Sequence, residues 1–136
     1  MKTVFLDSSV LFSAINSPTG GSSKLFVTKR LRLVTSKVVL AEVERNVRKK
    51  LASYHLERMS LLVEQLTILS QAPQSERIKE ANAVIAQKDA VILAEAKESK
   101  ADILATLDKK HFFTQAVTDF VKPQKIMAPK MILMTH

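Results

Sequence analysis

Two aspartates fall where parallel-sheet proteins bind their ligands. Asp7 ends the apolar run at residues 2–6, and Asp108 closely follows the apolar segment 101–106. Both segments have the length and composition of buried strands. Because ligands of open α/β sheets bind beyond the carboxyl ends of the strands, we expect both carboxylates at that edge.

Two further acids lie on predicted helices that lead toward the same edge. Glu42 sits at the margin of an apolar stripe that recurs every four residues from Val39 to Leu51. Asp89 begins a helix whose next residues, AVILAEA, are nearly all apolar. A carboxylate at the start of a helix is stabilised by the helix dipole. Taken singly, these acids also fit ordinary roles as helix caps, turn residues or exposed residues.

Together the four carboxylates indicate a divalent cation. Acids crowded at one sheet edge repel one another, and the chain as a whole carries a net charge of +8. The absence of cysteine excludes a thiolate zinc site, and three scattered histidines disfavour a nitrogen-rich zinc site. His111 is expected to have a structural or surface role. Ligation by oxygen favours Mg²⁺ or Mn²⁺.

Strand-like and helix-like segments alternate along the chain. Strands are predicted at 2–6, 31–35, 67–70, 101–106 and 125–128, and helices from Ser8 or Ser9 to the 17–21 loop, over 22–30 with Ser22 or Ser23 as cap, from the cap Ser36 to Leu51, and over 54–65, 75–86 and 88–99. This order predicts one α/β domain over residues 1–136, a three-layer α/β/α sandwich around a mainly parallel sheet of four to five strands. An extended tail is expected after the last strand.

The basic balance favours a polyanionic partner. The sequence pI is about 9.9, and such proteins bind phosphate backbones through counterion release. Five cations are candidates for RNA contact: Lys24, Arg45, Arg48, Lys109 and Lys110. A solvated helix face explains Arg48 equally well. One tyrosine and no tryptophan leave little material for stacking on bases.

The chain shows no signal peptide pattern and no apolar run long enough to cross a membrane. A cytoplasmic protein is therefore expected, and the absence of cysteine suits a reducing compartment.

Four segments in order resemble the PIN-domain family. VFLDSSVLFSA resembles its opening strand and first helix, SKVVLAEVERNVRKKL its glutamate-bearing helix, KDAVILAEAKESKAD its aspartate-bearing helix, and ADILATLDKKHF its final acidic strand end. MAPKMIL is loosely similar to endings found there, so the resemblance covers nearly the whole chain.

The resemblance implies a Mg²⁺- or Mn²⁺-dependent endoribonuclease, most often the toxin half of a bacterial toxin–antitoxin pair of the VapC-like group. It assigns metal binding and catalysis to an acidic cluster of Asp7, Glu42, Asp89 and Asp108. Ser9, which replaces the more common Asn, and Thr106 become orienting hydroxyls. Asp102 matches a position that is often acidic, and a capping role before or within the last core strand fits it equally well. An antitoxin and a second copy of the chain are the implied protein partners.

Other enzyme classes fit the sequence less well, and two functional alternatives stay open. Haloacid-dehalogenase-type phosphatases need a second Asp where Ser9 stands, and receiver domains need an acidic pair and a late Lys that are missing here. A catalytically silent PIN-like scaffold that binds RNA or protein, and a housekeeping RNA-processing nuclease, are the remaining alternatives.

Overall fold

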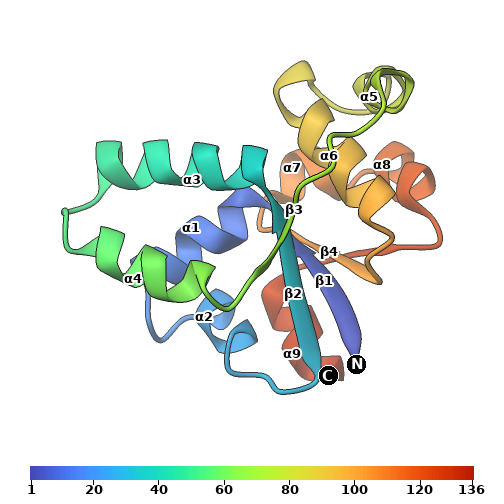
Figure 1. The fold of residues 1–136 in the computed structure, drawn as a ribbon. Coiled ribbons are helices and arrows are strands. Elements are labelled where there is room, and N and C mark those ends of the chain that lie inside the picture. The colour runs from blue at the N-terminus through green and yellow to red at the C-terminus, as the bar shows by residue number, and fades with distance from the viewer.

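The computed structural model describes residues 1–136, and its centre is a sheet of five parallel strands (Figure 1). The strands are β1 (Lys2–Leu6), β2 (Leu31–Ser36), β3 (Thr67–Leu69), β4 (Ile103–Ala105) and β5 (Lys125–Met127). Their order in the sheet is β3-β2-β1-β4-β5. β1 is central, and Val4 lies opposite Leu33 of β2 and Ile103 of β4. Its last three residues are fully buried, as expected of a parallel strand covered on both faces.

Helices cover both faces of the sheet. They are α1 (Ser8–Asn16), α2 (Gly21–Leu25), α3 (Lys37–Lys50), α4 (His55–Val63), α5 (Ser75–Asn82), α6 (Gln87–Ser99), α7 (Lys109–Phe112), α8 (Gln115–Val121) and α9 (Pro129–Thr135). In Figure 1, α1, α3 and α4 lie on one side of the strands, and α5, α6 and α8 lie on the other. The predicted three-layer α/β/α sandwich is confirmed.

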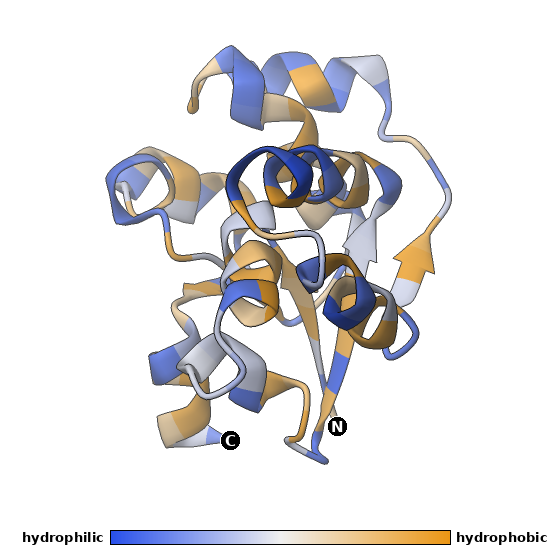
Figure 2. Ribbon diagram, turned by 90° about the vertical axis from the view of Figure 1, so that its left-hand side faces the viewer, coloured by the Kyte–Doolittle hydropathy of each residue, from blue (hydrophilic) through white to orange (hydrophobic).

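The helix predicted from the four-residue repeat is confirmed with its cap. The Ser36 side chain accepts a hydrogen bond from the Val39 backbone N–H, and Val39, Val43 and Val47 are buried. These valines join a single cluster of 32 buried hydrophobic residues. Figure 2 shows the same segregation, with apolar colour concentrated in the inner strands and hydrophilic colour on the outer helix surfaces.

The predicted second helix is too long and has the wrong cap. The observed α2 covers only Gly21–Leu25, and its N-cap is Gly20. Ser23 is buried, and its hydroxyl donates to the carbonyls of Ala14 and Ser17 instead of capping a helix. The chain then turns through residues 26–30 into β2.

The C-terminal part also differs from the prediction. α7 and α8 connect β4 to β5, because neighbouring parallel strands need a crossover connection. The expected extended tail is instead α9, which starts with Pro129 at its first turn and buries Ile132. Proline favours this position because its φ angle is already helical and its missing N–H would be unpaired there. No helix is long and apolar enough to cross a membrane.

Candidate metal and catalytic site

Asp7 lies at the point where β1 passes into α1. It is the N-cap residue of α1, and only 4% of its surface is exposed. Its Oδ2 accepts hydrogen bonds from Ser9 Oγ at 2.7 Å and from Thr106 Oγ1 at 2.8 Å. Burial raises the pKa of Asp7, and these two hydroxyls oppose the increase. The strand end therefore presents a buried carboxylate held in one orientation.

The hydroxyls of Ser9 and Thr106 also fix the chain that leads to the second strand-end acid. Ser9 Oγ accepts from the Leu107 backbone N–H at 3.0 Å, and Thr106 Oγ1 accepts from the Asp108 N–H at 3.1 Å. The two hydroxyl oxygens are 3.4 Å apart. One polar network therefore joins the ends of β1 and β4. Asp7 and Thr106, which it connects, are 99 residues apart in sequence.

Asp108 caps the short helix α7 and contacts a histidine. Its Oδ1 accepts from the His111 backbone N–H at 3.1 Å, and its Oδ2 lies 2.9 Å from His111 Nδ1. Asp89, Asp108 and His111 each offer one potential ligand atom, and these atoms lie within 4.8 Å of one another. The sequence did not predict that His111 lies beside the acids. Its position three residues after Asp108 was the available signal, because residues three apart in a helical turn face each other.

Two of the acids have a carboxylate oxygen that is buried without a hydrogen-bond partner. These atoms are Glu42 Oε2 on α3 and Asp89 Oδ2 in the first turn of α6. Burial raises the pKa of Asp89, the nearby charges of Asp7 and Asp108 raise it further, and Lys88 opposes the shift. Buried carboxylate oxygens are normally paired with donors or cations. A hard divalent cation fits this donor set of oxygens.

Comparison with known proteins decides the family. The PIN-domain family matches residues 4–116. The chain belongs to the PIN-domain family. Members of this family are generally nucleases that use divalent metal.

Several solved structures share the fold. A chain of VapBC2 from Rickettsia felis, bound to a DNA fragment from its promoter, has a TM-score of 0.71 and 19% identity, covering 93% of this chain and 98% of that chain. DNA-bound VapBC from Salmonella typhimurium has a TM-score of 0.70 and 18% identity, covering 95% and 99%. PAE2754 from Pyrobaculum aerophilum has a TM-score of 0.66 and 15% identity, covering 98% and 94%. No curated protein matches the sequence.

In this PIN domain, Asp102 lies away from the acidic cluster, which favours the capping role over a supporting role at the metal site. It precedes β4, whereas Thr106 and Asp108 follow that strand. Its Oδ2 accepts from the Thr3 backbone N–H at 2.8 Å, near the start of β1. Residues before and after a strand lie at opposite edges of a parallel sheet, so Asp102 caps the amino-terminal edge.

The predicted RNA-contact cations are placed differently from one another. Lys109 and Lys110 are exposed and directly follow Asp108 at the start of α7. Arg45 is exposed on α3, and Arg48 on the same helix pairs with Glu44 at 3.1 Å. Lys24 lies on α2, which packs on the C-terminal end of α1 through the bond from Ser23 to Ala14, whereas Asp7 lies at the N-terminal end (Figure 1). Only Lys109 and Lys110 directly adjoin an acid of the cluster.

Proposed function

We propose that this PIN domain is a Mg²⁺- or Mn²⁺-dependent endoribonuclease and the toxin component of a toxin–antitoxin pair. The two buried, unpaired oxygens of Glu42 and Asp89 carry the proposal, because a fold retains such atoms at a cost unless a ligand compensates them. Family membership supports the nuclease class. The net charge of +8 supports a polyanionic substrate.

Four carboxylates would hold the cation: Asp7, Glu42, Asp89 and Asp108. When bound, it would supply Lewis acidity and a water of lowered pKa for phosphodiester hydrolysis. Ser9 and Thr106 hold the Asp7 carboxylate by their hydroxyl donors, and His111 holds that of Asp108. Such contacts to a ligand's own carboxylate orient it toward the ion.

Exposed lysine and arginine side chains would bind the RNA substrate. Lys109 and Lys110 lie next to Asp108 and can bind the phosphates that flank the scissile bond. Arg45 and Arg48 on α3 would extend this contact surface along the RNA chain. Because the protein has little aromatic surface for stacking on bases, these contacts position the RNA backbone more than they read the base sequence.

The proposed antitoxin partner is supported by the similarity to VapBC proteins from Rickettsia felis and Salmonella typhimurium. A homodimer is part of the same proposal. Size-exclusion chromatography with light scattering, for the chain alone and co-expressed with the product of an adjacent reading frame, tests both assemblies.

The decisive experiment is cleavage of a mixed RNA pool with Mg²⁺, with Mn²⁺ and with chelator, for the parent and for Asp7→Asn. We expect cleavage that needs metal and Asp7, together with growth arrest on induction in a bacterial host. RNA binding without cleavage would instead indicate a silent scaffold. Cleavage without growth arrest would indicate a processing nuclease.

A further inference from the structure

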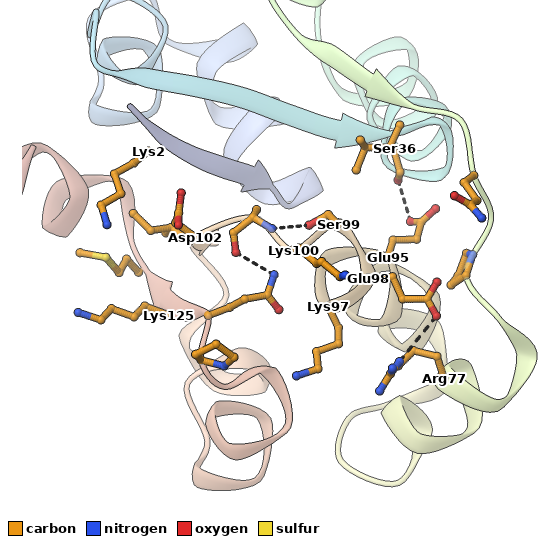
Figure 3. A pocket seen from close by; sticks show the side chains of 18 of the residues that line it. Lys2, Ser36, Arg77, Glu95, Lys97, Glu98, Ser99, Lys100, Asp102 and Lys125 are labelled. Carbon is orange, nitrogen blue, oxygen red and sulfur yellow. Dashed lines mark hydrogen bonds and ion pairs between the residues drawn. The ribbon is translucent and has the colours of Figure 1, made fainter.

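A buried glutamate on α6 stands apart from the acidic cluster and has no role in the site described above. Glu95 is 8% exposed and lies among the apolar residues of α6. Its Oε1 accepts a hydrogen bond of 2.7 Å from Ser36 Oγ (Figure 3). No Lys, Arg or His forms an ion pair with it. The Arg77 side chain nearby pairs with Glu98, one turn further along α6, instead.

Ser36 makes two hydrogen bonds through one hydroxyl. It donates to Glu95, and it accepts from the Val39 backbone N–H at 3.1 Å as the N-cap of α3. Ser36 is also the last residue of β2, and it is 1% exposed. The buried pair therefore connects the side of α6 to the junction of β2 and α3, across 59 residues of sequence.

The two connected helices are those that carry the unpaired carboxylates. Asp89 precedes Glu95 by six residues on α6, and Glu42 follows Ser36 by six residues on α3. Six residues of helix span about 9 Å, so each acid lies less than two turns from the connection. A rigid contact at this distance restricts both the spacing and the rotation of the two helices.

We propose that Glu95 is a positioning residue for the metal site: through Ser36 it fixes the start of α3 relative to α6 across the end of β2, so that Glu42 and Asp89 face the same cation. This inference rests on the proposed function and adds to it a residue outside the acidic cluster. The pair lines a groove of 1120 Å³ between α6 and the sheet, together with Glu98 and Arg77 (Figure 3).

The chemistry of the pair suits positioning better than stability. A buried carboxylate loses hydration, and this burial raises the pKa of Glu95. Apolar residues of similar volume often stabilise a fold as well as buried polar groups or better. A hydroxyl-to-carboxyl hydrogen bond, however, is short and directional, which an apolar contact is not. The directional hydrogen bond to Ser36, rather than a gain in stability, therefore explains why a glutamate occupies this position on an apolar helix.

The test compares Mn²⁺ affinity by titration calorimetry in the parent, Glu95→Leu and Glu95→Gln, with Glu98→Leu as the matched control from the same groove. We expect Glu95→Leu to weaken Mn²⁺ binding about tenfold, as outer-shell changes do, while its melting temperature in chelator equals or exceeds that of the parent. Glu95→Gln keeps the accepting oxygen and should restore affinity to within about threefold of the parent. Glu98→Leu should bind Mn²⁺ like the parent.

RNA cleavage at saturating Mn²⁺ adds a second readout. Glu95→Leu should lower kcat with little change in KM, because the RNA-contact cations are untouched. A Glu95→Leu protein with parental Mn²⁺ affinity, or an equal loss in the Glu98→Leu control, would overturn the proposal.

Ser36→Ala removes the donor of the same hydrogen bond, so it tests the proposal even if Glu95→Leu does not fold. Ser36→Ala should weaken Mn²⁺ binding by itself, and where Glu95→Leu folds, adding it to Ser36→Ala should cause no further loss. Additive losses would show that the two residues act separately and would contradict the proposal. A parent that binds no Mn²⁺ overturns the proposed function as well, whereas a parent that binds Mn²⁺ and is unaffected by these changes overturns the positioning role alone.

Discussion

The fold disfavours the charge of Asp7. Its side chain is buried, and burial raises its pKa despite the hydroxyl donors of Ser9 and Thr106. The pKa of Asp89 is raised as well, first by burial and then by the charges of Asp7 and Asp108. Both carboxylates therefore bind a proton more readily than free aspartate when no cation is present. The proposed metal ion would supply the missing positive charge.

Asp7→Asn should abolish RNA cleavage while leaving the fold intact. The amide keeps an oxygen that can accept from Ser9 and Thr106, but it loses the charge that would bind the cation. We expect at least about a hundredfold loss of rate, since even outer-shell partners contribute 10–100-fold. A cleavage time course and circular dichroism measure both effects. Asp119→Asn, at an exposed acid of α8, is the control and should cleave normally.

Asp89→Asn should raise the melting temperature in chelator, because it removes one charge from a crowded site. The same change should remove most of the stabilisation by Mn²⁺, which at ten times its Kd is about 1.4 kcal/mol for the parent, a shift of a few degrees. Differential scanning calorimetry with and without Mn²⁺ measures both. Asp89→Ala, measured in parallel, distinguishes the loss of a metal ligand from the loss of a stabilising contact at the start of α6. If both variants keep the full Mn²⁺ shift, Asp89 does not belong to the metal site.

At the scale of elements, helix N-termini converge on the acids. Asp7 is the N-cap of α1, Asp108 is the N-cap of α7, and Asp89 lies in the first turn of α6. The positive end of a helix stabilises a carboxylate placed there. The helices thus offset part of the repulsion among the acids, and they hold the acids at one edge of the sheet.

The helix α9 closes the C-terminal end of the fold. It packs against α2 and β5, and Ile132 is fully buried. Ile132→Ala should lower the free energy of unfolding by about 2–5 kcal/mol, the range for removing a large buried side chain. Urea denaturation measures the loss. Met134→Ala on the same helix, where the side chain is 78% exposed, should change stability little. Equal effects of the two changes would argue against the packed helix.

For the whole molecule, the raised pKa values predict a metal-free protein that loses stability as pH rises. Between the ordinary aspartate pKa of 3.8 and the raised values of Asp7 and Asp89, the folded state binds more protons than the unfolded chain. Stability from these groups is therefore full below the ordinary pKa and is lost as pH rises through the raised values.

Melting curves in chelator across this pH range measure the effect. The Asp7→Asn, Asp89→Asn double variant should show a flatter dependence than the parent, and Mn²⁺ should restore the stability of the parent at neutral pH. A pH dependence identical in parent and double variant would contradict the predicted shifts.

The net charge of +8 predicts RNA binding that weakens steeply with salt. The slope of log K against log salt should shrink by about 0.7 for each contacting cation removed from a single-stranded complex. Fluorescence anisotropy with Lys109→Ala should show this reduction. Lys24→Ala, on α2 beside the C-terminal end of α1, is the matched control and should leave the slope unchanged. A reduced slope for Lys24→Ala alone would place the RNA on the opposite side of the molecule.

Local patterns in the sequence were sufficient for most elements and for the placement of Asp7 and Asp108 at strand ends. Alternation of apolar strands and helices predicted the parallel sheet, and a four-residue repeat with Ser36 as cap predicted α3. Asp7 and Asp108 were found because they follow strands closely, and a strand's direction determines the edge at which its end lies. These are short-range properties, encoded by neighbouring residues.

The tertiary structure alone decided which side chains meet. The bond from Thr106 to Asp7 joins residues 99 positions apart, and that from Ser36 to Glu95 joins residues 59 apart. Such contacts depend on strand register and helix packing, which no local pattern specifies. For the same reason the sequence showed Glu95 only as one residue of an apolar helix, and it left Asp102 open between capping and metal ligation. Helix α9 was missed because burial against α2 and β5, rather than local propensity, stabilises a seven-residue helix.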